Sequence, residues 1–175
     1  MERILVTGGV RSGKSRYAES LLPAEAEVTY LTPGYPADHD AEWAARIAAH
    51  RLRRPPAWRT VETLDVATAL SEADPPVLID CLGTWLTRLI DSWQAWDDTD
   101  AALAARLEPE VTRLVAAITA HQSQVVIVTN EVGWGVVGEH RSGRIFADHL
   151  GRLNQRVAGA CDQVVLMVAG RPLTL

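Results

Sequence analysis

The sequence predicts an α/β fold in which a mostly parallel β-sheet is flanked by helices. Short apolar runs, typical of buried strands, alternate along the chain with helical patterns of about ten to twenty residues. The first apolar run leads directly into a glycine-rich loop, as in parallel sheets that bind ligands beyond the carboxyl ends of their strands. A chain of 175 residues suits one substantial core, so we predict a single domain over residues 1–175.

Prolines and glycines separate the predicted elements in the first half of the chain. Apolar runs predict strands at Ile4–Thr7, Val28–Leu31 and Trp58–Glu62. Helical spacing predicts helices at Lys14–Leu22, Asp40–Leu52 and Leu64–Ala73. Pro23 ends the first helix and Pro55-Pro56 ends the second, because proline cannot continue a helix. Between the second strand and the second helix, prolines and a glycine predict a loop over Thr32–Asp40.

The second half of the chain repeats the alternation with longer helices. Strands are predicted at Val77–Asp80, Val125–Thr129 and Gln163–Val168, with a last edge strand in the tail Pro172–Leu175. Helices are predicted at Leu82–Trp93, Ala101–Ala120 and Arg141–Ala160. Asp97, Asp98 and Asp100 favour the start of the long helix, since carboxylates stabilise a helix N-terminus.

One motif predicts that the chain binds a nucleoside triphosphate. The pattern G-x-x-x-x-G-K-[ST] of phosphate-binding loops occurs as Gly8, Gly9, Val10, Arg11, Ser12, Gly13, Lys14 and Ser15. Its glycines let backbone N–H groups cradle phosphate oxygens, and Lys14 is the only lysine among 17 lysine and arginine residues. A compact ammonium fits between the β- and γ-phosphates where a planar guanidinium would not. The motif therefore makes the predicted fold a P-loop NTPase of the RecA-like kind.

A magnesium ion is the expected companion of the triphosphate. The hydroxyl of Ser15 is one expected contact of Mg²⁺, and an acid at the end of a neighbouring strand is the other. Asp80 ends one predicted strand and is favoured for this role, while Glu131, after Val125–Thr129, is the second candidate acid. The alternative for either carboxylate is that it caps the turn that follows its strand.

His50 is the histidine with two open interpretations. Trp43, Ile47 and His50 share one face of the predicted second helix, so His50 can be a half-buried residue without a chemical role. The basic segment Arg51–Arg54 can likewise be a solvated surface or a phosphate clamp. Nearby cations favour a neutral imidazole, which can act as a nucleophile. Spacing alone does not decide between these interpretations.

Composition excludes several classes of protein. The net charge of −5 argues against a general nucleic-acid binder. Cys81 and Cys161 are far apart and form no CxxC pair, so we predict two buried small apolar residues in a reducing cytoplasm rather than a disulfide. The segment before the glycine loop is too short for a signal peptide, and no apolar run has the length of a membrane span.

Together these segments resemble a known family, the bifunctional adenosylcobinamide kinase / adenosylcobinamide-phosphate guanylyltransferases of cobalamin biosynthesis. The resemblance covers nearly the whole chain. It is carried by Ile4–Gly9, Arg11–Arg16, Ala45-Arg46-Ile47 with His50, Trp58-Arg59-Thr60 with Glu62, Asp80-Cys81-Leu82, Val128–Gly133 and Gly151–Gln155. The phosphate loop alone is generic, whereas the ordered set with Thr-Asn-Glu-Val-Gly is specific.

The resemblance implies two reactions. A nucleoside triphosphate, ATP or GTP, phosphorylates the aminopropanol hydroxyl of adenosylcobinamide. GTP then transfers GMP to a histidine, which maps onto His50, and the phosphorylated cobinamide takes the GMP to give adenosyl-GDP-cobinamide. The implied nucleotide contacts are Gly8 to Ser15, Thr32, Pro33, Gly34, Arg51, Leu52, Arg53, Arg54, Glu62 and Asp80.

The resemblance also implies a homotrimer. Trp85, Trp93 and Trp96 are interpreted as exposed residues of subunit contacts, with the core as the alternative.

Two further functions stay open from the residues alone: a plain small-molecule P-loop kinase, in which His50 has no role, and a nucleotide-dependent switch or ATPase subunit. The Arg-Ile…His segment disfavours both.

Overall fold

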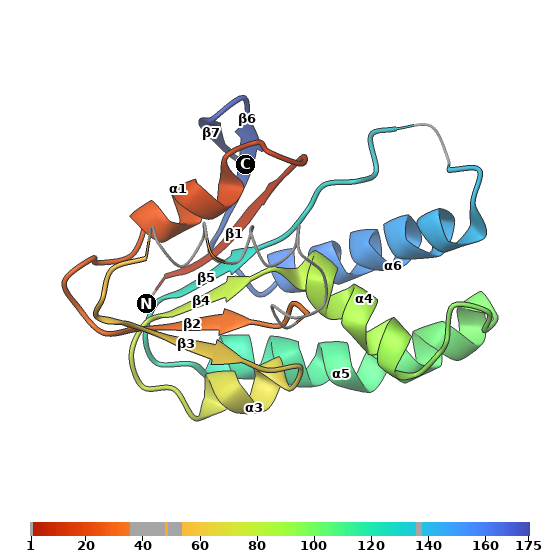
Figure 1. Cartoon of the computed structure of the whole chain (residues 1–175), viewed down its shortest axis with the longest axis horizontal. Coiled ribbons are helices and arrows are strands. Elements are labelled where there is room, and N and C mark those ends of the chain that lie inside the picture. Colours follow the sequence, from red (N-terminus) through yellow and green to blue (C-terminus); the bar gives the residue numbers. More distant parts are fainter. Residues whose placement is uncertain (1, 36–47, 49–53, 136–137) are drawn as a thin grey trace.

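A seven-stranded sheet forms the centre of the structure, a computed structural model that describes residues 2–35, 48, 54–135 and 138–175. Its strands are β1 (Arg3–Gly8), β2 (Val28–Thr32), β3 (Trp58–Glu62), β4 (Val77–Asp80), β5 (Val125–Val128), β6 (Gln163–Val168) and β7 (Arg171–Thr174). The order across the sheet is β3-β2-β4-β5-β1-β6-β7 (Figure 1). Only β6 and β7 pair antiparallel, so the predicted parallel sheet and the predicted edge strand in the tail are confirmed.

Five helices connect these strands in the described part of the chain. They are α1 (Lys14–Ser20), α3 (Val66–Ser71), α4 (Leu82–Ser92), α5 (Asp100–Ala120) and α6 (Arg141–Ala158). Each confirms a predicted helix, but α1, α3 and α6 are shorter than predicted by two or more residues and α4 by one. The helix predicted at 40–52 lies outside the described residues except for residue 48, which is helical.

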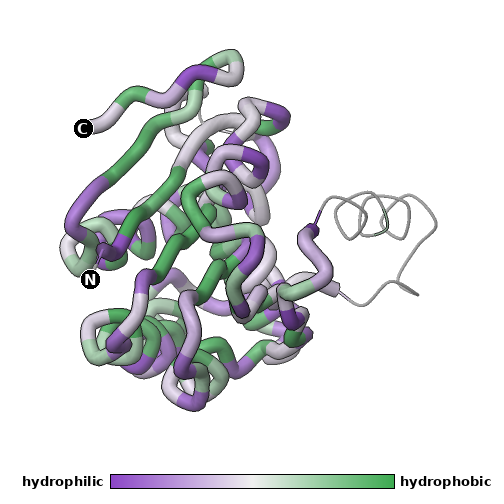
Figure 2. Tube along the Cα trace, turned by 90° about the vertical axis from the view of Figure 1, so that its left-hand side faces the viewer, coloured by the Kyte–Doolittle hydropathy of each residue, from purple (hydrophilic) through white to green (hydrophobic). Residues whose placement is uncertain are grey.

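The sheet separates two apolar clusters because strand side chains alternate between its faces. Ile4 and Val6 of β1 pack in the cluster that includes α1, whereas Leu5 packs in the cluster that includes α3, α4, α5 and α6. The tube in Figure 2 is accordingly most hydrophobic along the central strands. As a consequence, α1 lies on one face of the sheet, opposite α3, α4, α5 and α6.

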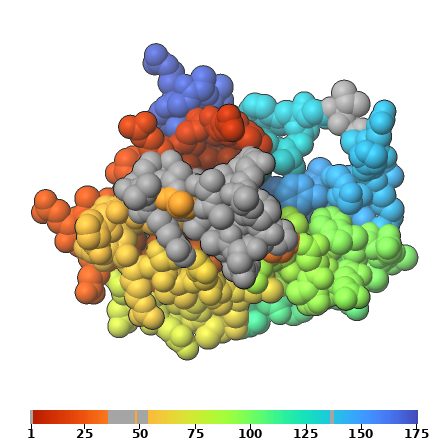
Figure 3. All heavy atoms as spheres, in the orientation of Figure 1, coloured from red at the N-terminus to blue at the C-terminus, as the bar shows by residue number. Residues whose placement is uncertain are grey.

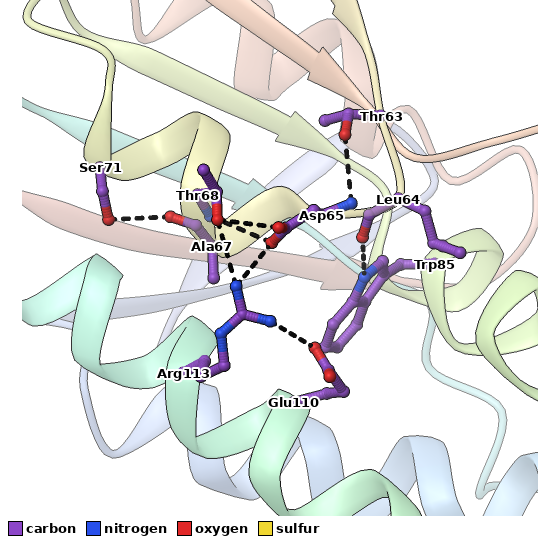
Figure 4. A network of polar contacts seen from close by, with 9 residues as sticks. All are labelled: Thr63, Leu64, Asp65, Ala67, Thr68, Ser71, Trp85, Glu110 and Arg113. Atoms are coloured by element: carbon purple, nitrogen blue, oxygen red, sulfur yellow. Dashed lines mark hydrogen bonds and ion pairs between the residues drawn. The ribbon is translucent and has the colours of Figure 1, made fainter.

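A polar network fixes the short helix α3 against α5 (Figure 4). The carboxylate of Asp65 caps α3 by accepting hydrogen bonds from the backbone N–H and hydroxyl of Thr68. Arg113 of α5 donates to Asp65 Oδ1 at 2.9 Å and to Glu110. The helix begins at Val66 rather than Leu64 because Asp65 provides this cap, and these hydrogen bonds, that of Thr68 above all, lower the pKa of Asp65.

Of the three tryptophans interpreted as exposed subunit contacts, Trp85 belongs to the core instead. Trp85 is 2% exposed, and its indole N–H donates to the Leu64 carbonyl at 2.9 Å (Figure 4). Trp93 and Trp96 are half-buried and pack against the same cluster. The interpretation was wrong for Trp85 because α4 turns its apolar face inward, a direction that the predicted helix alone does not fix. For Trp93 and Trp96 the role in subunit contacts stays a prediction.

Both cysteines are free and lie against apolar clusters. Burial raises the pKa of both thiols, that of Cys161 to about 12, with a further contribution from the neighbouring aspartate in each case. Neither side chain is therefore a thiolate at neutral pH. The prediction that the two cysteines are unpaired is confirmed, whereas both are half-buried rather than buried as predicted.

Candidate nucleotide-binding site

The phosphate loop, residues 8–15, connects the end of β1 to the start of α1. Gly8 has φ 153° and Gly13 has φ 94°, both in the region that favours glycine. A Cβ at Gly8 would lie 2.7 Å from the carbonyl oxygen of Met167, so a larger residue does not fit there. The glycines of the motif are therefore required by this backbone path as well as by the approach of a phosphate.

Backbone and side-chain hydrogen bonds hold the phosphate loop in place. Lys14 Nζ donates to the Gly9 carbonyl at 3.1 Å, and the Ser12 N–H donates to the same carbonyl. The Gly170 N–H, from the turn between β6 and β7, donates to the Ser12 carbonyl at 2.9 Å. The ammonium of Lys14 thus lies over its own loop, where the predicted triphosphate would bind.

Glu131 lies beside the phosphate loop, but its carboxylate caps a turn. Its backbone N–H donates to the Gly8 carbonyl at 3.1 Å, which continues the pairing of β5 with β1. Figure 3 accordingly shows the cyan segment that follows β5 next to the red N-terminal segment. Glu131 Oε1 accepts the Gly133 N–H at 2.7 Å. This arrangement agrees with the interpretation in which the Glu131 carboxylate caps the turn that follows its strand.

Asn154 of α6 fixes the end of β5 next to the phosphate loop, a role that the sequence did not predict. Its Oδ1 accepts from the fully buried Thr129 hydroxyl at 2.7 Å, and its Nδ2 donates to the Asn130 carbonyl at 3.1 Å. The available signal in the sequence was the position of Asn154, a polar residue within one turn of the apolar residues of an amphipathic helix.

Asp80 ends β4 and is held by a buried tyrosine. The hydroxyl of Tyr30, on β2, donates to Asp80 Oδ2 at 2.7 Å. The guanidinium carbon of Arg54 lies 3.4 Å from the centre of the Tyr30 ring, and Arg54 Nη1 donates to Thr60 Oγ1 at 2.9 Å. Burial, and then the charge of Asp80, raise the pKa of Tyr30, so its hydroxyl stays protonated and remains a donor.

The predicted contacts Thr32, Pro33, Gly34 and Glu62 lie at the ends of β2 and β3. Thr32 pairs in register with Glu62, so both lie at the same edge of the sheet as Asp80 and the phosphate loop. Arg88 of α4 holds the segment after β2, because its Nη1 donates to the Pro33 and Gly34 carbonyls at 3.1 and 2.8 Å. Sequence reasoning assigned no role to Arg88.

The structure therefore arranges the predicted residues in two regions of one edge. Two strands, β4 and β5, separate β2 from β1, which corresponds to about 14 Å at the usual strand spacing. Asp80 lies between the two regions. The predicted site residues His50, Arg51, Leu52 and Arg53 lie outside the described residues.

Asp80 and Ser15 are the predicted contacts of a magnesium ion that binds together with a triphosphate. Asp80 Oδ2 is engaged by Tyr30, while Oδ1 makes no hydrogen bond within the part of the chain that the structure describes. Among the described residues no three His, Cys, Asp or Glu side chains form a metal cluster. Magnesium commonly takes one or two protein ligands and completes its shell with phosphates and water. The available donors suit that kind of site.

Comparisons with known proteins extend over almost the entire chain. A model of the family described as cobinamide kinase / cobinamide phosphate guanyltransferase matches residues 4–175. The bifunctional adenosylcobalamin biosynthesis proteins CobU of Salmonella typhimurium and Escherichia coli are each 42% identical over 175 residues, covering 95% of this chain and 96% of the relative. CobP of Pseudomonas aeruginosa is 38% identical over 178 residues, covering 99% of this chain and 96% of the relative.

A solved structure supports the fold. It is the type III secretion ATPase of pathogenic bacteria, which superposes with a TM-score of 0.50 at 13% identity. The match covers 94% of this chain and 50% of that one. At this identity the likeness concerns the fold alone, and together with the phosphate loop it confirms the predicted P-loop NTPase class.

Proposed function

Because the chain belongs to the cobinamide kinase / cobinamide phosphate guanyltransferase family, we propose that it carries out both reactions of that family in cobalamin biosynthesis. In the first reaction, the aminopropanol hydroxyl of adenosylcobinamide attacks the γ-phosphorus of ATP or GTP. The bond to the β-phosphate breaks, the nucleoside diphosphate leaves, and the hydroxyl proton passes to solvent or a base. The product is adenosylcobinamide phosphate.

The kinase half of the proposal is supported by the phosphate loop. Phosphoryl transfer depends on positioning and on neutralising charge that develops on the phosphate oxygens. Lys14 provides a cation over the loop, and the Gly8 and Gly13 conformations let backbone N–H groups turn toward a phosphate. Mg²⁺, held by Ser15 and Asp80, would provide the Lewis-acid charge.

For the second reaction, we propose a covalent guanylylated His50. A ring nitrogen of His50 attacks the α-phosphorus of GTP, the bond to the β-phosphate breaks, and pyrophosphate leaves. A phosphate oxygen of adenosylcobinamide phosphate then attacks the same phosphorus, the P–N bond breaks, and His50 is restored. This division replaces one difficult transfer by two easier steps.

The assignment of His50 rests on its place in the family motif and on the chemistry around it. The β- and γ-phosphates must be held while the α-phosphorus is attacked, a role that suits the phosphate loop. Arg51 and Arg53 follow His50 in the sequence and are the proposed cations for the leaving pyrophosphate. Thr32, Pro33, Gly34 and Glu62 are the proposed contacts for the rest of the nucleotide.

Labelling with GTP that carries the isotope at the α-phosphate tests the covalent step. After denaturation, the wild-type protein should retain label that is labile in acid and stable in alkali, as expected for a phosphoramidate. His50→Ala should retain none. His140→Ala is the matched control, since His140 is exposed and its side chain does not cap α6.

Two outcomes would contradict parts of the proposal. Absence of label in the wild type under all conditions would refute the covalent intermediate, and label that persists in His50→Ala would refute the residue assignment. Lys14→Ala should lose both labelling and phosphorylation of adenosylcobinamide. Unchanged GTP affinity and turnover in Lys14→Ala would refute the role of the phosphate loop.

The remaining parts of the proposal concern the setting of the enzyme. We propose a homotrimer in the cytoplasm that acts on adenosylcobinamide and its phosphate and binds no nucleic acid. The free, half-buried cysteines are compatible with a reducing compartment. None of the described helices combines the length and the apolar character needed to cross a bilayer.

A further inference from the structure

Tyr30 lies in the apolar cluster on the α1 face of the sheet and carries a single polar atom into it. The residue is 1% exposed. The ring packs between Trp58, at a centroid distance of 6.4 Å, and the guanidinium of Arg54. Within the described part of the chain, the only partner of the hydroxyl is Asp80 Oδ2. A phenylalanine would fill the same space, so the hydroxyl serves Asp80 alone.

The strand register brings Tyr30 and Asp80 to the same face. Tyr30 of β2 pairs with Leu78 of β4, and both pack in the α1-side cluster. Asp80, two residues after Leu78, points to that same face because strand side chains alternate. The hydrogen bond ties one carboxylate oxygen and thereby fixes the plane in which Oδ1 lies.

Arg54 belongs to this arrangement rather than to a free cationic surface. Its guanidinium lies flat enough against Tyr30 to reach 3.4 Å from the ring centre, and Thr60 of β3 fixes one end of it. A cation over an aromatic face is attracted to the ring and holds it in place. Arg54 is also the fourth residue after His50. The contact of Arg54 with Tyr30 therefore lies directly after the residues proposed for guanylyl transfer.

We propose that Tyr30 is a positioning residue that orients the Asp80 carboxylate for Mg²⁺, and that Arg54 secures the Tyr30 ring instead of clamping a phosphate. The inference rests on the proposed function, since it requires Asp80 to act on the metal. Partners of metal ligands fix their direction, and a ligand that is free to rotate loses part of its affinity to conformational entropy.

A binding assay without turnover tests the inference. Binding of N-methylanthraniloyl-GTP to the full chain is measured by fluorescence as Mg²⁺ is titrated. Tyr30→Phe keeps the ring and its packing but removes the donor to Asp80. We expect the Mg²⁺ concentration for half-maximal effect to rise about tenfold, the scale for partners of metal ligands, with nucleotide affinity in EDTA unchanged.

Matched variants separate this role from a structural one. Tyr17→Phe removes a hydroxyl for which the described residues provide no hydrogen bond, and the Mg²⁺ response should stay as in the wild type. Arg54→Met should shift the Mg²⁺ response in the same direction as Tyr30→Phe. Weaker nucleotide binding by Arg54→Met in EDTA would instead identify Arg54 as a phosphate clamp and overturn that part of the inference.

Asp80→Asn distinguishes failure of the inference from failure of the proposed function. If Asp80→Asn weakens the Mg²⁺ response and Tyr30→Phe does not, the positioning role is refuted while the role of Asp80 stands. If Asp80→Asn leaves the Mg²⁺ response unchanged, both the role of Asp80 and the inference fail. A Tyr30→Phe, Asp80→Asn double variant no weaker than Asp80→Asn alone is the result expected for residues that act in series.

Discussion

Asn154→Ala should destabilise the protein more than any exposed substitution on α6, because Asn154 joins this helix to the end of β5. The change removes the acceptor of the Thr129 hydroxyl and the donor to the Asn130 carbonyl, at 2.7 and 3.1 Å. Thr129 is fully buried, so its hydroxyl cannot reach water in exchange. We therefore expect a loss at least as large as that of two ordinary hydrogen bonds.

The size of this loss depends on the two groups that no longer have Asn154 as a partner, the Thr129 hydroxyl and the Asn130 carbonyl. Each hydrogen bond contributes about 1 kcal/mol net, and a buried donor without a partner costs a further 1–3 kcal/mol, roughly. Asn154 itself is half-buried, so water can reach part of the space that its side chain leaves. A decrease in the free energy of unfolding of about 2–4 kcal/mol is the result.

Urea unfolding followed by far-UV circular dichroism measures this value, and a double-mutant cycle with Thr129→Val isolates the hydrogen bond. Valine removes the buried hydroxyl, so Asn154→Ala should cost less in the Thr129→Val background, by about 1 kcal/mol. Gln155→Ala is the control, since Gln155 is the next residue along the helix and is exposed. It should stay within about 0.5 kcal/mol of the wild type.

Two results would refute the reasoning. The first is an Asn154→Ala protein as stable as the Gln155→Ala protein, which would mean that the Thr129 hydroxyl finds another partner. The second is strict additivity in the cycle, within about 0.3 kcal/mol, which would mean that the two side chains do not interact.

Two further predictions concern nucleotide binding and pH. Arg88→Met removes the donor to the Pro33 and Gly34 carbonyls and should weaken N-methylanthraniloyl-GTP binding about fivefold, the scale of a lost hydrogen bond, with Arg113→Met as the control; equal affinities would contradict it. Burial lowers the pKa of His149 from 6.5, so the folded state resists protonation more than the unfolded chain. The free energy of unfolding should therefore fall as the pH drops from about 7.5 to about 5.5, and less so in His149→Gln; parallel pH profiles of the two proteins would be evidence against this role.

The fold was predictable because each signal is local. The strand runs are apolar, the turn residues are prolines and glycines, and parallel pairing follows from the alternation with helices. The helix boundaries were less predictable, since they depend on which side chain provides the cap. Asp65 moves the start of α3 by two residues from the predicted Leu64, and no periodicity indicates this.

The candidate site was predictable where a motif specifies both the type of each residue and the residues that lie next to it. The phosphate loop is such a motif, because its glycines, its lysine and its place after a strand are all written in consecutive residues. The partners of Arg88 and Asn154 were not predictable from periodicity, because each acts across the fold: Arg88 reaches the segment after β2 from α4, and Asn154 reaches the end of β5 from α6. Such contacts depend on the order of strands, which the sequence does not state.

Arg54 illustrates why a run of like charges cannot be interpreted residue by residue from sequence. It ends the basic segment after His50, and in the sequence it is equivalent to Arg51 and Arg53 as a candidate phosphate clamp. In the structure its guanidinium lies on the Tyr30 ring, whose hydroxyl donates to Asp80. A guanidinium held flat on an aromatic ring and bonded to Thr60 has lost part of its freedom to follow a moving phosphate. The last arginine of the run therefore contacts Tyr30, 24 positions earlier in the sequence, and the proposed phosphate clamp consists of the arginines that precede it.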